Sequence, residues 1–570
     1  MRSRRAHLLA IIVALAASAC GVPDAVSPDG NGQGAGSDAN LRLAEVRFTQ
    51  GAQEPDGSIP LVAGMPVAVN VLIQRSRESV AEVPVVLRLF RGGSLVHLDT
   101  VRTGGVLGAS INAASPSAQF LIPRVLVTDS LAWQVEIDPA QSITDSTRTD
   151  NVLPATAPAA LNVVHLPPMD VRLVPISLAS QGGVTGNVSE ANAAQYLSGV
   201  QSLLPTGALT FGVNGPLSVQ ENFGTAPDGG SLDFWRSVAQ DLDIARLLSS
   251  SPTSTWIGIV PLPPGFTRLT NGGYAFIPAN PSNSGAGTRS ALALEFTSLF
   301  GTAYVRDVLA HELAHTFGRS HAPGCGAGAP IDAAFPGVLG TIGTAGHDVY
   351  RWASGAATLA LSSAATTGDV MSYCSPVWTS PYTWNAVLRW RQASGSVATS
   401  TARTRVTLVA GSVGADGSIT VRPALDADAL LPPDDPYGDV TVELRSAGGS
   451  VLRRTRVQSA VGENSGVRYF VAILRSLGDA GDEIVATNTA GASAHVLRHQ
   501  AIDEISSRSV RSGATEISSS AGNALLVRDA ASGDVLGIGW HGRVAISRSA
   551  GLSVTVSDGV RSAQRIVVPR

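Results

Sequence analysis

The feature that most constrains the fold is a short run of residues near the middle of the chain. Residues 311–321 read His-Glu-Leu-Ala-His-Thr-Phe-Gly-Arg-Ser-His. A helix places His311 and His315 on one face, one turn apart, where both imidazoles can reach the same metal ion. Glu312 lies between them, where its carboxylate can take a proton from a metal-bound water. The spacing therefore predicts a helix, beginning near Thr302, that carries a metal-binding face.

The residues after the second histidine predict a sharp end to this helix. Gly318 follows His315 by three positions, and glycine readily adopts the left-handed conformation that ends a helix. The chain can then turn back and bring His321 to the metal as a third nitrogen ligand. Three protein ligands leave one position for water, as a catalytic zinc site requires, so we expect Zn²⁺ here. The alternative is an amphipathic helix with surface histidines.

The complete pattern, His-Glu-x-x-His-x-x-Gly-x-x-His, resembles the active-site signature of the metzincin clan of zinc endopeptidases. Those proteins place a methionine-containing turn beneath the metal. Residues 369–374, Asp-Val-Met-Ser-Tyr-Cys, look like that turn, and the Met-x-Tyr spacing is similar to that of astacins and serralysins. The resemblance implies that Met371 packs beneath the imidazoles and that Tyr373 is an extra zinc ligand or an oxyanion stabiliser. For both residues an ordinary core role is the alternative.

The resemblance also implies an activity, the zinc-dependent hydrolysis of peptide bonds in extracellular proteins or glycoproteins. Glu312 would be the general base on a zinc-bound water. Substrate would add to a sheet edge as an extra strand, with residues 274–277 or 292–296 as the two candidates. The competing hypothesis is a cell-surface adhesion or glycan-binding lipoprotein whose protease domain is inactive or secondary. The intact Glu312 favours the endopeptidase.

Length and patterning predict several domains. The chain has 570 residues, too many for one hydrophobic core. Residues 41–166 alternate short β-branched runs with turn clusters, which predicts an Ig-like β-sandwich; residues 397–570 read the same way and predict one or two small β-sandwich domains. Residues 167–396 mix strands with helices, expected at 191–204 after an N-cap at Ser189 and at 232–248. The expected fold class is multidomain, with an α/β metzincin-like catalytic domain flanked by β-sandwiches.

The first residues predict export. Arginines at positions 2, 4 and 5 precede an apolar stretch, residues 8–16, that is too short to span a bilayer. The following Ala-Ser-Ala-Cys resembles a bacterial lipoprotein signal, with residues 1–19 as signal peptide, Cys20 as the lipidated residue and residues 20–40 as a flexible linker. We expect a lipid anchor, the only membrane contact, on the bacterial envelope at the outer membrane or cell surface. The alternative is an ordinary secretory signal and a secreted protein.

The remaining cysteines predict a disulfide bond. If Cys20 is acylated, Cys325 and Cys374 form the one remaining pair, and disulfides persist in exported proteins. Such a bond would tie the loop after His321 to the methionine turn. Two buried free thiols are the alternative.

Composition excludes other classes of protein. Hydrophobic residues make up 44% and charged residues 15% of the chain, which is typical of a globular rather than a disordered protein. The net charge is −4 and no basic stripe stands out, so nucleic acid is not an expected partner. The acidic segment 426–439 lacks the EF-hand pattern, and we expect a solvated loop there rather than a calcium site.

Overall fold

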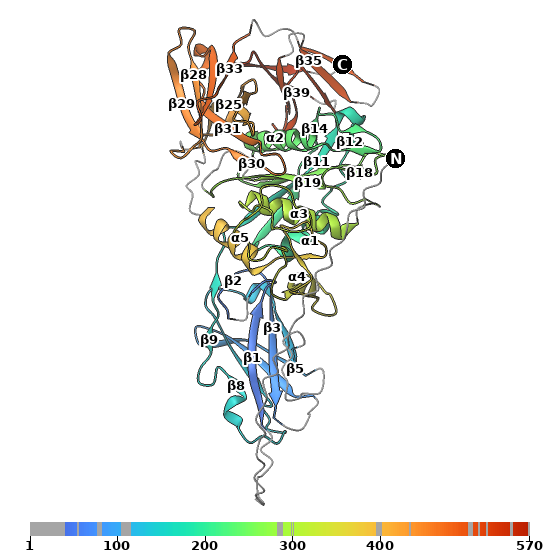
Figure 1. The fold of residues 1–570 in the computed structure, drawn as a ribbon, viewed down its shortest axis with the longest axis vertical. Helices are drawn as coiled ribbons and strands as arrows, with labels where there is room; N and C mark the ends of the chain where they lie inside the picture. The colour runs from blue at the N-terminus through green and yellow to red at the C-terminus, as the bar shows by residue number, and fades with distance from the viewer. Residues whose placement is uncertain are drawn as a thin grey trace, which may run out of the picture.

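The computed structural model describes residues 40–567 except 54–55, 77–81, 104–115, 282–288, 298, 300, 395–401, 433–434, 500–504, 511–513, 520–522 and 548–550. The predicted signal peptide, Cys20 and all but the last residue of the predicted linker lie outside the described residues. The described part is mostly β-structure in several sheets, as the sequence predicts. Figure 1 shows three parts stacked along the long axis, with residues 41–164 at one end, residues 169–394 in the middle and the C-terminal strands at the other end.

Two facing sheets form the first part. Their strand orders are β1–β3–β6 and β5–β4–β7–β8, with β9 paired to β7. The bounds are β1 (Leu41–Thr49), β3 (Val67–Arg75), β4 (Pro84–Arg91), β5 (Ser94–Arg102), β6 (Ala118–Ile122), β7 (Leu131–Ile137), β8 (Val152–Leu153) and β9 (Ala159–Ala160). Alternate residues of β3, such as Val69 and Val71, point into the core shared by the two sheets. This part is therefore a β-sandwich.

The opposite face of β3 packs against the middle part. Ala68 lies in one buried cluster with Val349 of the short helix α4 (Val349–Ala353). Beside it, Asn70 Nδ2 lies 3.3 Å from Nε2 of His347. His347 is half-buried at this junction.

The middle part is built on a mixed sheet. Four parallel strands run in the order β13–β11–β17–β20, β14 also pairs with β11, and β19 lies antiparallel beside β20. The bounds are β11 (Met169–Leu178), β13 (Leu209–Val213), β14 (Leu217–Val219), β17 (Thr255–Val260), β19 (Gly273–Ile277) and β20 (Ser290–Leu294). The helices are α1 (Ala193–Leu203), α2 (Leu232–Leu248), α3 (Thr302–Thr316) and α5 (Pro381–Ser394).

Alternating side chains of the sheet explain why helices cover both of its faces. Ile257 and Ile259 of β17 pack in the core that contains α1 and α3, whereas Trp256 and Val260 pack in the core that contains α2. Gly258 is needed between them, because a Cβ there would lie 2.6 Å from the Leu292 side chain and 3.1 Å from Leu242 of α2.

The predicted helix boundaries agree with the structure except at the start of α1. Helix α2 has the predicted bounds, and Ser231 caps it by accepting a hydrogen bond from Phe234 N at 3.2 Å. The sequence placed the N-cap of α1 at Ser189, which is wrong. Residues 190–192 form a turn first, in which Asn192 N donates to Ser189 O at 3.1 Å, and the helix begins at Ala193 with Asn192 as N-cap.

The C-terminal strands continue the middle sheet at both of its edges. At one edge β30 (Ala460–Gly462) pairs antiparallel with β19, and at the other β37 (Val535–Gly539) pairs with β14. Further strands of this part are β25 (Arg403–Val413), β28 (Val440–Arg445), β31 (Arg468–Arg475), β32 (Glu483–Asn488), β35 (Thr515–Ser519) and β36 (Ala524–Asp529). Leu408 and Leu526 from these strands share a core with α2, so this helix is covered on both sides.

The sequence predicts one or two small β-sandwich domains over residues 397–570, and in the structure two strands of this region also pair with the middle sheet. The exposed backbone groups of edge strands are a ready pairing site, and both edges of the middle sheet are used in this way. No helix among the described residues combines the length and the apolar character needed to cross a membrane.

Candidate metal centre

Helix α3 carries the first two histidines, as the spacing predicts. His311, Glu312 and His315 lie in its last two turns, and all three side chains are buried. Gly318 then has φ of +72°, the left-handed conformation expected for a residue that ends a helix. A side chain could not be added at this position, because a Cβ would lie 2.4 Å from the ring of Trp390 in α5.

The loop after α3 brings the third histidine next to the first two, and backbone hydrogen bonds fix this loop. His321 is fully buried, its backbone N donates to Pro330 O at 3.0 Å, and its carbonyl accepts from Asp332 N at 2.8 Å. Asp332 in turn forms an ion pair with Arg319 at 2.7 Å. The ring centroids of His315 and His321 are 4.7 Å apart, and that of His311 is 5.2 Å from that of His321.

Backbone carbonyls fix which nitrogen each imidazole turns to the centre. Nδ1 of His311 lies 2.6 Å from Val370 O, Nδ1 of His315 lies 2.6 Å from Arg319 O, and Nδ1 of His321 lies 2.7 Å from Gly328 O. A carbonyl can only accept, so each Nδ1 carries a proton and each ring turns its Nε2 to the centre. This is the usual outer hydrogen bond of a metal-binding histidine.

A fourth residue, which the sequence analysis missed, completes the group. Glu463 follows β30 in the C-terminal part, and its Oε2 lies 3.3 Å from Nε2 of His315 and 3.6 Å from Nε2 of His321. One ligand atom from each of His311, His315, His321 and Glu463 lies within 4.8 Å of all the others, and the four residues are buried. This group could bind a metal ion.

The distances fit a tetrahedral ion. Nε2 of His315 and Nε2 of His321 are 3.2 Å apart. Two nitrogens bound to one zinc at its usual bond length and tetrahedral angle would be about 3.3 Å apart. Nδ1 of His315 and Nδ1 of His321 donate to backbone carbonyls. When these imidazoles are neutral, their Nε2 atoms and the carboxylate oxygen of Glu463 can only accept at this centre. A cation between them satisfies the four atoms at once.

Burial controls the protonation of the site. It lowers the pKa of His311 to about 3, and it also lowers the pKa of His315, so both rings favour the neutral form that binds metal. Burial raises the pKa of Glu312 well above its usual range, and the neighbouring Glu463 raises this pKa further. Oε2 of Glu312 is buried and has no hydrogen-bond partner among the described residues.

The methionine turn lies against the same helix. Met371 is buried in the core that contains α1 and α3, and the preceding residue, Val370, accepts the His311 hydrogen bond. The buried Asp369 holds the turn: its Oδ1 accepts from Met371 N at 2.8 Å and its Oδ2 accepts from Ser380 N at 2.9 Å. The structure therefore brings Met371 to the metal group, next to the residue that orients one ligand.

Tyr373 faces the metal group from the end of this turn. Its hydroxyl lies 3.4 Å from Nε2 of His321 and accepts a hydrogen bond from Asn464 Nδ2 at 2.8 Å. The side chain is 44% exposed, so it lies at the rim of the site rather than inside the core. The next residue, Cys374, forms a disulfide bond with Cys325, which ties the turn to the loop after His321.

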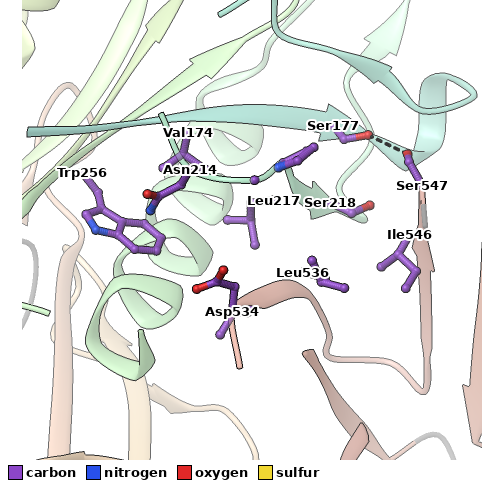
Figure 2. Close-up of a pocket in the computed structure, with 13 residues that line it drawn as sticks. Val174, Ser177, Asn214, Leu217, Ser218, Trp256, Asp534, Leu536, Ile546 and Ser547 are labelled. Carbon is purple, nitrogen blue, oxygen red and sulfur yellow. Dashed lines mark hydrogen bonds between the residues drawn. The ribbon is translucent and has the colours of Figure 1, made fainter. Parts of the chain in front are cut away.

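Two cavities show where a ligand could lie. One, of about 640 Å³, borders the metal group and is lined by Glu312, Tyr373 and Glu463 among others. Figure 2 shows the second, of about 250 Å³, between β11 and β14 on one side and residues 534–536 on the other. Among the residues lining the second cavity, Asp534 is the one ionisable side chain, so the chemistry of this chain is expected at the first.

Comparison with known proteins gives no family for this chain. No protein-family description matches the sequence, and no curated protein matches it. The chain shares 14% identity with a CARDB domain from Pyrococcus furiosus solved with di-metal ions, over 22% of this chain and 90% of that one, at a TM-score of 0.15.

Two solved glycosidases cover more of the chain. For a β-glucuronidase from Parabacteroides merdae the identity is 9%, the coverage 93% of this chain and 77% of that one, and the TM-score 0.15. For a β-glycosidase from Bacteroides vulgatus the identity is 9%, the coverage 93% and 79%, and the TM-score 0.15. TM-scores this low support no argument about function. The function is therefore argued from the residues of the metal group.

Proposed function

We propose that this chain is a zinc-dependent endopeptidase of the metzincin type that hydrolyses peptide bonds of extracellular proteins. The single observation that carries the proposal is the buried convergence of three imidazoles beside Glu312, which lies on the helix that carries two of them. Each imidazole donates its Nδ1 proton to a backbone carbonyl, so the three lone pairs face one point.

The ligand set favours zinc. Imidazole nitrogens suit zinc, and three of them are the protein ligands of a common type of catalytic site. Held by His311, His315 and His321, zinc would act as a Lewis acid toward the scissile carbonyl and would make water more acidic.

The side chains around the metal position suit peptide hydrolysis. Glu312 would accept the proton of the attacking water and later give it to the leaving amine, and its unpartnered Oε2 is available for the water. The hydroxyl of Tyr373 would donate a hydrogen bond to the oxyanion. The adjoining cavity could hold a substrate side chain.

The sheet distinguishes the two candidate strands for substrate binding. Strand β20 lies between β17 and β19, so it has no free edge. Within the middle part β19 is the outer strand, and its other edge pairs with only two residues of the C-terminal strand β30. We therefore assign substrate addition to β19.

The proposal includes export with a lipid anchor at Cys20. The disulfide between Cys325 and Cys374 supports an oxidising compartment, because such bonds are rare in the cytosol. Labelling of cells with a fatty-acid analogue should mark the wild-type chain and not Cys20→Ala. Equal labelling of both would contradict the anchor.

The experiment that tests the activity uses the full chain and its Glu463→Ala variant, because Glu463 lies at the fourth ligand position. Both are incubated with unfolded casein, with and without a zinc chelator. We expect one zinc per chain by elemental analysis, cleavage by the variant, and loss of cleavage with the chelator that added zinc restores. If both proteins hold zinc and neither cleaves casein or a peptide library, the endopeptidase proposal is wrong.

A further inference from the structure

We propose that residues 460–464, here called the latch segment, close the metal site from within the chain. The C-terminal part lays this segment along the edge where substrate would bind and supplies Glu463 as a removable fourth metal ligand. The inference rests on the proposed endopeptidase function and concerns the regulation of the same site. Cleavage then requires the latch segment to move away.

The first observation is the position of β30 on the sheet. Its residues pair antiparallel with β19, with Gly462 opposite Phe276 and Val461 opposite Ile277. An extended peptide added to β19 needs the same backbone donors and acceptors. Substrate and latch segment therefore exclude each other along this edge.

The second observation is the placement of the Glu463 carboxylate. Its Oε1 accepts a hydrogen bond from Ala275 N of β19 at 3.3 Å, while Oε2 lies 3.3 Å from Nε2 of His315. The carboxylate thus connects the sheet edge to the metal position. A tetrahedral ion bound by three imidazoles and this oxygen has no position left for water.

The third observation is that Asn464 forms a hydrogen bond with the hydroxyl of Tyr373 at the rim of the site. Asn464 Nδ2 donates to the Tyr373 hydroxyl at 2.8 Å, and Asn464 N donates to Ala329 O at 2.7 Å. The fit against the loop after His321 is close, because a Cβ on Gly328 would lie 1.6 Å from Asn464 Oδ1. The metal position, the sheet edge and the tyrosine are thus all covered by one short segment.

A permanent structural site does not explain the neighbouring groups. Such a site needs no extra carboxylate, yet Glu312 is buried beside it with Oε2 unpartnered and opens on the cavity of about 640 Å³. The pairing of β30 with β19 is confined to two positions on each strand, whereas β31 pairs with β25 along its whole length. The base of the β30–β31 hairpin is anchored through β31, whereas its tip is held by the short pairing with β19 and by the contacts of Glu463 and Asn464, so breaking this small set of contacts would free the tip.

The test measures access to the metal without measuring catalysis. The full chain is loaded with Co²⁺, and acetohydroxamate, a small metal-binding ligand, is titrated while the visible absorption of the cobalt is recorded. We expect Glu463→Ala to bind acetohydroxamate at least about 10-fold more tightly than wild type, because the wild-type site is open in a minor fraction of molecules. Asn464→Ala, which keeps the carboxylate, should show a smaller gain.

The matched control is Glu516→Ala. Glu516 belongs to the same C-terminal part but pairs with Arg508 on the surface, so its removal should leave the acetohydroxamate affinity at the wild-type value. If Glu463→Ala does not fold, as judged by circular dichroism, the isosteric Glu463→Gln takes its place with the same expected direction.

The outcomes separate the latch from the metal centre. Equal acetohydroxamate affinity in wild type and Glu463→Ala, with Co²⁺ held by both, overturns the latch and leaves the endopeptidase proposal intact. Loss of Co²⁺ from Glu463→Ala but not from wild type also overturns the latch, because Glu463 is then an obligatory structural ligand. A wild-type chain that holds no Co²⁺ or zinc overturns the metal centre itself.

Discussion

Glu463 Oε2 lies 3.3 Å from Nε2 of His315, although the two residues stand far apart in the sequence. The histidine comes from the middle part and the glutamate from the C-terminal strands that continue its sheet. The candidate metal centre is therefore assembled from two parts of the chain. Any movement of the C-terminal strands relative to β19 changes the ligand set, which joins the architecture of the protein to the chemistry of its site.

Replacement of the proposed general base should separate catalysis from metal binding. We expect Glu312→Gln, made in the Glu463→Ala background, to lower the rate of peptide cleavage by about 10²–10⁴-fold, the usual contribution of general acid–base catalysis. The zinc content should be unchanged, because Glu312 is not among the ligands that converge on the metal position. Elemental analysis and cleavage of a fluorogenic peptide measure the two effects. A rate within a few-fold of the parent would remove Glu312 from the mechanism.

Loss of the third histidine should weaken the metal site. His321→Ala removes one of three nitrogen ligands, and we expect zinc affinity to fall by more than about 100-fold, beyond the usual effect of outer hydrogen-bond partners. Competition with a zinc-sensitive dye gives the affinity. His495→Ala is the control, because His495 contacts Glu483 on β32 and lies outside the metal group. Equal zinc affinity in His321→Ala and His495→Ala would contradict the three-histidine site.

Local patterns allowed much of the middle part to be predicted. The helix expected at residues 232–248 is α2, and the histidine spacing predicted α3, because the signals for each lie within one local stretch of sequence. The joining of β30 to β19 could not be predicted. Strand pairing between distant segments depends on which sheet edges meet in the folded chain. The local sequence of neither strand indicates which strand it will pair with.

The same distinction holds for the metal group. His311, Glu312 and His315 are fixed by helical spacing, and His321 by the glycine turn that follows. Glu463 has no such signal, since it stands in Val-Gly-Glu-Asn-Ser-Gly, a composition typical of an ordinary surface turn. Only the register of β30 on β19 carries its carboxylate to the histidines.

Removal of the disulfide should destabilise the region beneath the metal. Cys325 and Cys374 are 49 residues apart, and a bond closing a loop of this size contributes about 4 kcal/mol in the chain-entropy model. We expect the double variant Cys325→Ser/Cys374→Ser to unfold at a lower temperature by calorimetry, with a loss of about 2–4 kcal/mol in unfolding free energy. Reducing agent should lower the midpoint of the wild type toward that of the variant. An unchanged midpoint under both treatments would show that this bond does not stabilise the fold.

Acid should weaken the junction between the first sandwich and the middle part through His347. Burial lowers the pKa of His347 to about 4, whereas an unfolded histidine titrates near its usual value of about 6.5. Between these pH values the unfolded chain binds more protons than the folded chain, so the unfolding free energy falls as pH falls. The slope from this one residue is at most about 1.4 kcal/mol per pH unit, and above about pH 6.5 the contribution is constant.

The variant His347→Gln should therefore lose part of the acid sensitivity of the wild type. The measurement is the midpoint of thermal unfolding at several pH values between 4 and 7, compared between the two proteins so that the metal-site histidines, common to both, cancel. The exposed His541 provides the control, and His541→Gln should follow the wild-type curve. Histidine takes up a proton when the chain unfolds in acid, whereas glutamine cannot. Parallel curves for wild type and His347→Gln would therefore show that the protonation of His347 does not affect stability.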